Sequence, residues 1–197
     1  MQIERPKSKQ PIPEHAKCVF SGVLFDTYQW EQKLFDGTTK TFEKIKRPDT
    51  VSVFAVLPDG RILLTEQEQP GKAPFIAATG GQVDRGEDVL TAAKRELLEE
   101  SGYEADTFVL WHAEQPVAKI EWAIYNFIAK GLRKVKDLHL DAGEKIKLKP
   151  VSFDEFIELA SHKDFYEKEI VDLVLRARLD PAKMVDLKKL FDPATNE

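Results

Sequence analysis

Cysteine is almost absent from this sequence, which has one, Cys18, among 197 residues. A single thiol cannot form a disulfide within the chain, and an isolated cysteine is typical of proteins of the reducing cytoplasm. Histidine is also scarce, and the four histidines are scattered without the Cys/His spacing of a zinc site. We therefore expect a cytoplasmic protein without a structural zinc ion.

Long hydrophobic runs and a basic surplus are absent as well. The longest largely apolar run covers residues 51–57, far short of the roughly 20 residues that a membrane-spanning helix needs. Residues 1–17 are polar and do not resemble a signal peptide. The net charge of −5 is opposite in sign to that of most nucleic-acid-binding proteins. These features predict neither a membrane nor a nucleic-acid partner.

The remaining composition is ordinary for a globular protein, with 42% hydrophobic and 32% charged residues. Residues 1–16 contain three prolines and several charges, and they look like a flexible arm. Beyond them, Asp36-Gly37 is a hairpin turn between alternating segments. Strands are predicted at residues 18–25, 27–34, 38–46, 51–57, 61–66, 75–79, 107–113, 121–129 and 146–150, with a strand and loop at 132–140. Helices are predicted at residues 88–101, 152–162, 164–178 and from 181 onward. This order predicts an α+β fold with helices on both sides of a mixed sheet.

The predicted helix at residues 88–101 carries an unusual set of carboxylates. Glu96, Glu99 and Glu100 follow the spacing i, i+3 and i+4, so all three project from one helix face. Like charges at this spacing repel one another unless a cation lies among them. Because the site is all oxygen, we expect a hard divalent cation, Mg²⁺, with Mn²⁺ as the alternative.

A glycine turn precedes this helix, and an arginine lies beside its acidic face. A backbone carbonyl of the turn at residues 80–81 can add an oxygen ligand. Arg95 can form a bidentate pair with Glu87 at the start of the helix. Because Mg²⁺ prefers substrate phosphates as partners, the expected substrate carries a diphosphate. A clustered cation would polarise the phosphoryl oxygens and acidify the water that attacks phosphorus.

The same residues follow one another with a defined spacing. After Gly81 come five residues, Glu87, seven residues and the run Arg-Glu-Leu-x-Glu-Glu-x-Gly at 95–102. This pattern matches the Nudix box, and the chain resembles the Nudix hydrolase family. The resemblance implies an α/β/α sandwich at residues 48–197, including C-terminal helices, after an N-terminal antiparallel β-hairpin region at 17–47. The metal ligands that it implies are Gly80, through its carbonyl, and Glu96, Glu99 and Glu100.

Nudix enzymes differ in the general base that removes a proton from the attacking water. Some use a box glutamate, and others use a carboxylate from a loop beyond the sheet. Residues 141–144, Asp-Ala-Gly-Glu, lie in such a loop before the strand at 146–150. We predict Glu144 as the base, with Glu99 and Asp141 as alternatives, and an ordinary polar turn remains an open interpretation. The predicted catalytic residues are Glu144, Glu99, Glu100, Arg95 and Glu87.

Residues 41–47 resemble a segment of the ADP-ribose pyrophosphatase branch. In that branch the N-terminal strands pair into a homodimer, and residues matching Phe42, Glu43 and Arg47 help to hold the nucleotide. An aromatic face can stack on a base, a carboxylate can accept from a base amine, and an arginine can grip phosphate. Phe25 and Trp30 are further stacking candidates, and each of these aromatics could instead pack in the core or a dimer interface.

Three positions bear on the choice of substrate within this branch. Glu121, five residues after Pro116, resembles a glutamate that meets the phosphate–sugar region of the substrate. Branch members carry an arginine shortly after a loop glutamine, whereas this chain has Gln69 in that loop. They also carry a Glu-x-Pro-Ala-Gly turn into the box, where residues 77–81 read Ala-Ala-Thr-Gly-Gly. A glutamine cannot replace an arginine fork on phosphate, so other nucleoside diphosphate sugars are expected beside ADP-ribose.

The sequence thus predicts a metal-dependent pyrophosphohydrolase, a homodimer, that cleaves a nucleoside diphosphate sugar to a nucleoside monophosphate and a sugar phosphate. The alternatives are a Nudix pyrophosphatase of dinucleotides or nucleoside triphosphates, and a non-catalytic module that binds nucleotide sugars.

Overall fold

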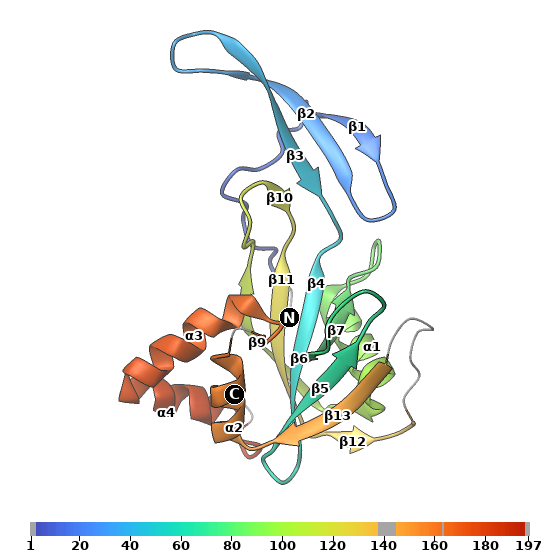
Figure 1. The fold of residues 1–197 in the computed structure, drawn as a ribbon, viewed down its shortest axis with the longest axis vertical. Coiled ribbons are helices and arrows are strands. Elements are labelled where there is room, and N and C mark those ends of the chain that lie inside the picture. The colour runs from blue at the N-terminus through green and yellow to red at the C-terminus, as the bar shows by residue number, and fades with distance from the viewer. Residues whose placement is uncertain (1–2, 138–144, 163, 196–197) are drawn as a thin grey trace.

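A narrow β-sheet stands on a wider domain in the computed structural model, which describes residues 3–137, 145–162 and 164–195 (Figure 1). The helices in these residues are α1 (Val89–Ser101), α2 (Phe153–Ala160), α3 (Lys168–Leu179) and α4 (Pro181–Leu190). None of the described helices has the length and apolar character needed to cross a membrane.

The wider domain is built on a mixed sheet with the strand order β13-β5-β4-β11-β9. Strands β6 and β7 extend it by pairing with β5 and β4. Its strands are β4 (Thr50–Val56), β5 (Ile62–Glu68), β6 (Phe75–Ala77), β7 (Thr79–Gln82), β9 (Thr107–Glu114), β11 (Ile124–Lys130) and β13 (Lys145–Val151). Strands β4 and β11 are parallel, and the other pairings in this sheet are antiparallel. The mixed sheet expected from the sequence is therefore confirmed.

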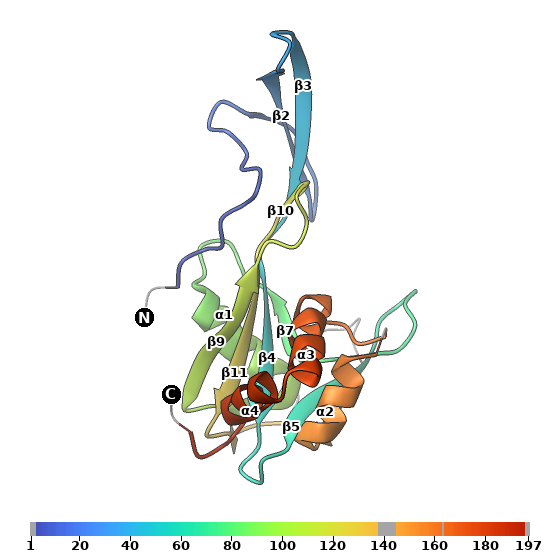
Figure 2. The same cartoon turned by 90° about the vertical axis from the view of Figure 1, so that its left-hand side faces the viewer.

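Both faces of this sheet are covered by helices, because strands β4 and β11 are apolar on both sides. Phe54 and Ile128 pack with residues of α2, α3 and α4 in one core cluster. Val53 and Phe127 pack with α1 in a second cluster. Figure 2 shows α1 on one side of the sheet and α2 to α4 on the other. The expected α+β fold, an α/β/α sandwich, is confirmed.

Local sequence accounts for the position of α1. The Asp88 carboxylate caps its first turn by accepting from the N–H groups of Leu90 and Thr91. Gly102 ends the helix in the left-handed conformation at φ 74°, which a glycine adopts without strain. Strands β8 (Tyr103–Glu104) and β12 (Arg133–Lys134) pair just beyond this end. The sequence prediction of a helix at 88–101 is thus met within one residue.

The narrow sheet has the strand order β1-β2-β3-β10. Its strands are β1 (Lys17–Ser21), β2 (Asp26–Lys33), β3 (Thr39–Lys46) and β10 (Ile120–Glu121). The predicted hairpin turn is present between β2 and β3, where Gly37 has φ 85° and Asp36 accepts from the Thr38 N–H. Strands β1 to β3 project away from the helices of the wider domain (Figures 1 and 2). Strand β10 joins this sheet through a short parallel pairing with β3, and the chain then enters β11 of the mixed sheet.

The start of α3 differs from the prediction. The sequence predicts a helix from residue 164, whereas α3 begins at Lys168. Phe165 instead forms a parallel bridge with Ile76, and the Tyr166 N–H donates to the Ile76 carbonyl at 3.0 Å. The Glu167 carboxylate accepts from the Ala78 N–H at 3.0 Å. These contacts with the β6–β7 segment outweigh the helix propensity of residues 164–167.

Candidate active site

The acidic face of α1 lies against strand β7. The Gly80 N–H donates to Glu100 Oε2 at 2.8 Å, and the Glu96 carboxylate fills the space that a Cβ on Gly81 would need. The glycine at position 81 therefore lets the Glu96 carboxylate approach the strand backbone, whereas the glycine at position 80 leaves room for the backbone of Val51 and Ser52 in β4. Glu100 is only 6% exposed, whereas the Glu99 side chain is 43% exposed. The three carboxylates thus run from a buried position to an open one.

Arg95 joins these carboxylates to the start of the helix. Its Nε and Nη2 donate to the two oxygens of Glu87 at 3.1 and 3.0 Å. Its Nη1 donates to Glu96 at 2.7 Å and to Glu99 at 3.2 Å, and its Nη2 also reaches the Gln82 carbonyl at 2.9 Å. Hydrogen bonding to Arg95 holds the pKa of Glu87 below its usual range. Glu87 therefore stays ionised and fixes the arginine beside the acidic face.

The donor set suits a hard divalent cation. All candidate ligands are oxygens, and Gly81 of β7 leaves room for the Glu96 carboxylate at the strand. Within residues 3–137, 145–162 and 164–195, no three histidine, cysteine or acidic side chains are gathered as a ready metal cluster. Arg95 engages Glu96 and Glu99 instead. A divalent cation would thus share the Glu96 and Glu99 carboxylates with Arg95. These residues can hold the cation if Arg95 releases its hydrogen bond to one of the two carboxylates.

The predicted general base is not placed by the structure. Glu144 and its alternative Asp141 lie outside the described residues, in the segment that precedes β13. The other alternative, Glu99, lies on α1 with an accessible side chain. The choice among these three carboxylates stays a prediction.

Two of the predicted substrate-binding residues lie on the projecting sheet. Phe42 and Glu43 are in β3, where Phe42 packs 6.1 Å from the Trp30 ring and beneath the Lys119 ammonium at 5.3 Å. Glu43 is exposed and accepts from Gln29 at 2.7 Å. Because β3 points away from α1 (Figure 1), the structure does not bring these residues to the acidic face of their own chain.

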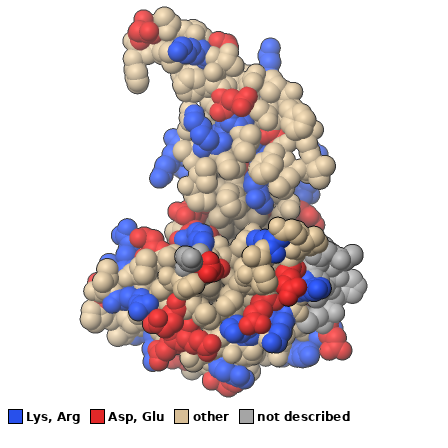
Figure 3. All heavy atoms as spheres, in the orientation of Figure 1, with Lys and Arg blue, Asp and Glu red and all other residues tan. Residues whose placement is uncertain are grey.

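Arg47 lies lower, where β3 ends and the chain enters the wider domain. Its guanidinium stacks on the Trp122 ring at 4.6 Å and lies 6.0 Å from the Phe25 ring. The buried Nε atom of Arg47 has no hydrogen-bond partner in the described residues. Burial lowers the pKa of this guanidinium, although it remains charged at neutral pH. Figure 3 shows basic side chains on the narrow waist below the projecting sheet.

Glu121 is already engaged within the chain. Its two oxygens accept from Arg5 and from Lys44, each at 2.7 Å. Arg5 also forms a bidentate pair with Asp49, at 2.7 and 2.9 Å. These bonds connect the N-terminal arm, the narrow sheet and the wider domain. The flexibility predicted for residues 1–16 stays a prediction, but Arg5 is held here, and a substrate would have to compete for Glu121.

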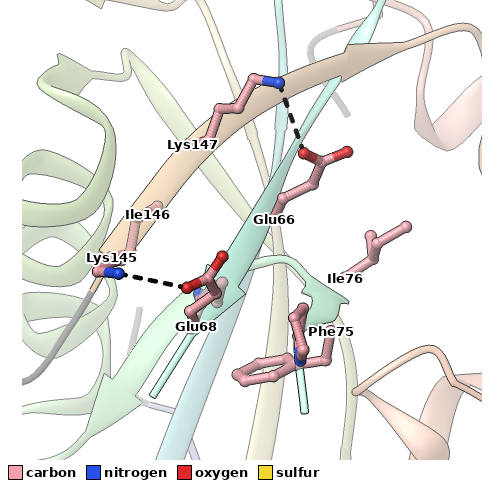
Figure 4. Close-up of a pocket in the computed structure, with 9 residues that line it drawn as sticks. Glu66, Glu68, Phe75, Ile76, Lys145, Ile146 and Lys147 are labelled. Atoms are coloured by element: carbon pink, nitrogen blue, oxygen red, sulfur yellow. Dashed lines mark hydrogen bonds and ion pairs between the residues drawn. The ribbon is translucent and has the colours of Figure 1, made fainter. Parts of the chain in front are cut away.

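A cavity of about 380 Å³ opens between β5, β6 and β13. Figure 4 shows its two ion pairs, Lys145 with Glu68 at 3.5 Å and Lys147 with Glu66 at 3.7 Å. No residue of the Nudix-like box lines it. Because its lysines are paired with carboxylates, this cavity offers an anion little net attraction. Phe75, on its rim, belongs to an aromatic group that sequence reasoning missed.

That group consists of Lys72, Phe75 and Tyr166, which come from the loop after β5, the start of β6 and the turn before α3. Tyr166 also interacts electrostatically with Arg47. No local sequence pattern identifies these residues, because Tyr166 lies 91 positions after Phe75 and 94 positions after Lys72.

Comparison with known proteins gives a family match. Residues 46–174 match the profile of the family described as NUDIX domain. The chain is 29% identical over 168 residues to a methanol dehydrogenase activator of Bacillus methanolicus. The aligned region covers 83% of this chain and 90% of that protein. The chain is 28% identical over 153 residues to an ADP-ribose pyrophosphatase of Bacillus subtilis (strain 168), covering 76% and 82%.

A solved structure supports the same architecture. The crystal structure of an ADP compounds hydrolase superposes with a TM-score of 0.67, covering 89% of this chain and 97% of that one. Its sequence identity to this chain is 20%, so the likeness concerns the fold.

Proposed function

The chain belongs to the NUDIX domain family and is a Nudix hydrolase, and from this membership we propose the reaction that it catalyses. The proposed reaction is hydrolysis of the diphosphate in ADP-ribose or another nucleoside diphosphate sugar, to a nucleoside monophosphate and a sugar phosphate. The observation that carries it is the approach of Glu96 and Glu100 of α1 to Gly81 and Gly80. That geometry collects carboxylate oxygens, which can serve as metal ligands, beside the backbone of β7.

A divalent cation, Mg²⁺ or Mn²⁺, is part of the proposal. Glu96, Glu99, Glu100 and the carbonyl of Gly80 would hold it. When bound, it would neutralise the diphosphate, polarise the phosphoryl oxygens and lower the pKa of a water. Arg95 keeps two of these carboxylates oriented through its bonds to them. Release of one such bond would make a carboxylate oxygen available.

We assign the general base to Glu144, which would take a proton from the attacking water, with Glu99 and Asp141 as alternatives. Glu144→Gln tests this assignment. The expected result is a loss of kcat of about 10²–10⁴-fold, the usual contribution of a positioned base. A kcat within a few-fold of wild type would remove Glu144 from this role and leave the reaction itself intact.

The substrate class rests on similarity and on the narrow sheet. The relative from Bacillus subtilis is an ADP-ribose pyrophosphatase, and β3 presents an aromatic and a carboxylate, Phe42 and Glu43, suited to a base. Arg47 would grip phosphate. Glu121 would contact the phosphate–sugar region only if it gave up a bond to Arg5 or Lys44. Gln69, in place of a loop arginine, favours a range of nucleoside diphosphate sugars over ADP-ribose alone.

A homodimer completes this proposal. Strands β1 to β3 project from the domain (Figure 1), and Val19, Phe20 and Phe35 in and near them are exposed. A second copy would cover this apolar surface, and the projecting Phe42 and Glu43 would then reach the partner's acidic face. Light scattering at micromolar concentration should give twice the chain mass. We place the protein in the cytoplasm because its one cysteine, Cys18, is free and exposed.

One experiment tests the reaction. The purified protein is incubated with ADP-ribose, other nucleoside diphosphate sugars, dinucleoside polyphosphates and nucleoside triphosphates, with Mg²⁺ or with EDTA, and products are identified by chromatography. We expect a nucleoside monophosphate and a sugar phosphate, formed only with Mg²⁺, and a loss of this activity in Glu100→Gln. Turnover of triphosphates or dinucleotides alone would overturn the substrate class. Full activity in Glu100→Gln would overturn the acidic face as the site.

A further inference from the structure

Lys72, Phe75 and Tyr166 form a compact group at the start of β6, here named the Tyr166 wall. The rings of Phe75 and Tyr166 lie 4.8 Å apart at an interplanar angle of 30°. The Lys72 ammonium lies 3.6 Å from the Phe75 ring centre and 4.2 Å from that of Tyr166. Both distances are well within the range of a cation–π contact. The lysine is therefore held against the two rings although it comes from a loop.

The backbone fixes this group in place. The Tyr166 N–H donates to the Ile76 carbonyl at 3.0 Å, and Phe165 forms a bridge with the same residue. The turn before α3 is thereby tied to β6, directly after Phe75. Despite these bonds Tyr166 is 53% exposed. The wall consequently presents a rigid aromatic face to solvent, which loses little conformational entropy when a planar ligand stacks on it.

Two cations near this face form no ion pair with any residue that the structure describes, although the charge of Glu167 acts on Lys72. In the described part of the chain, neither Lys72 nor Arg47 has a carboxylate oxygen within 4.0 Å. Burial lowers the pKa of each of them. The Arg47 charge acts on Tyr166 and lowers the pKa of its phenol, opposing the larger effect of burial. Both cations thus lie where an anion would stabilise them.

The wall lies across β6 and β7 from the acidic face of α1. Glu167, the residue after Tyr166, accepts from the Ala78 N–H, and Gly80, two residues on, donates to Glu100. The charge of Glu100 reaches Glu167 and helps to raise the pKa of that buried carboxyl, for which burial is the larger cause. A ligand on the wall is therefore close to the proposed cation site, and the two could share one extended substrate.

We propose that the Tyr166 wall and Arg47 form a subsite for the nucleoside monophosphate part of the substrate, with the base stacked on Tyr166 and a phosphate between Lys72 and Arg47. The inference rests on the proposed function for its choice of ligand. It adds three residues that neither the box nor the narrow sheet contains, and it stacks the base on Tyr166 in place of Phe42 of β3. Unchanged AMP binding in Tyr166→Leu would return the base to Phe42. The phosphate supplies the anion that both cations lack, and the base covers the exposed ring.

The test is binding in EDTA, which needs neither a metal nor turnover. Isothermal titration calorimetry measures the dissociation constants of AMP and ribose 5-phosphate for the full chain and its variants. Lys72→Met should weaken both ligands about tenfold or more, because a charged hydrogen bond is lost. Tyr166→Leu should weaken AMP alone about tenfold, because ribose 5-phosphate has no base to stack. Tyr166→Phe keeps the ring and should bind AMP like wild type.

Lys188→Met is the matched control, because Lys188 also lies over a phenylalanine ring, that of Phe153, at 5.9 Å. It belongs to α4, away from the box, and its loss should change neither dissociation constant. Melting curves of all variants establish that each is folded. Wild-type dissociation constants in Lys72→Met and Tyr166→Leu, or no AMP binding by the wild type, would overturn the subsite.

Kinetics separate this inference from the proposed reaction. If nucleoside diphosphate sugars are hydrolysed, the Lys72 and Tyr166 variants should raise KM about tenfold while kcat stays within about twofold, as for lost ground-state binding. Hydrolysis with an unchanged KM in both variants would refute the subsite and spare the reaction. AMP binding that depends on both residues, without hydrolysis of any such sugar, would refute the reaction and spare the subsite.

Discussion

Replacement of Lys44 by methionine should destabilise the protein strongly, because this lysine is buried with all its bonds inside the chain. Its side chain is 0% exposed, and its ammonium donates to Ser8 Oγ, the Gln10 carbonyl and Glu121 Oε2, each at 2.7 Å. Methionine has a similar length but offers no donor. Breaking a buried ion pair by removing one partner costs about 3–5 kcal/mol. Because Arg5 still pairs with Glu121, we expect a loss of about 3 kcal/mol, the lower end of that range.

Urea denaturation, followed by circular dichroism and intrinsic fluorescence, measures this loss. The matched control is Lys40→Met on the same strand, since Lys40 is exposed; such a surface change usually stays within about 0.5 kcal/mol. A melting temperature lowered by roughly 6–12 °C should accompany a loss of about 3 kcal/mol in a chain of this size. A loss below about 1 kcal/mol would refute the reasoning, because it would mean that water replaces all three bonds.

Three further predictions concern the box and its carboxylates. Gly80→Ala should lower the free energy of unfolding by about 1–3 kcal/mol, because the added Cβ meets the Val51 carbonyl of the neighbouring strand, which cannot yield; unchanged urea midpoints would contradict this. In Gly81→Ala the nearest atoms to the added Cβ belong to the flexible Glu96 carboxylate, so this change should lower Mg²⁺-dependent kcat about tenfold or more at nearly wild-type stability, a result checked by parallel kinetics and denaturation. The pKa of Glu87 is lowered in the folded state, so its stabilisation is present above the unfolded pKa of about 4.3 and is lost as pH falls through the folded value. Urea midpoints should therefore fall below about pH 4.3 and fall less in Glu87→Gln; equal pH profiles would argue against this role.

Features coded by neighbouring residues could be predicted from the sequence. The helix α1 has its cap at Asp88 and its terminating glycine at Gly102 within 15 residues (88 to 102), so local spacing locates it. The alternation of the strands and the Asp36-Gly37 turn likewise determine the β2–β3 hairpin. The approach of Glu100 to the β7 backbone follows from these elements once Gly80 is known to pack against the helix.

Features that depend on distant partners could not be predicted in the same way. The start of α3 is displaced because residues near 166 bond to β6, about 90 residues earlier. Glu121 matched a substrate-binding position by resemblance, yet its partners Arg5 and Lys44 lie 116 and 77 residues away. Nothing in the local pattern around Glu121 indicates that either cation will reach it. The Tyr166 wall was missed for the same reason.

The ion pairs of Arg5 affect how the protein is assembled during synthesis. Arg5 leaves the ribosome before Glu121, which is 116 residues later in the chain. At about 5–20 residues per second, that interval is roughly 6–23 s. During this time Arg5 can pair with Asp49, which is 44 residues along the chain, but not with Glu121. A nascent chain arrested before residue 121 should therefore show the arm as more sensitive to protease than the complete chain. The contact of Arg5 with Glu121 is accordingly formed late in the synthesis of each molecule, after its contact with Asp49.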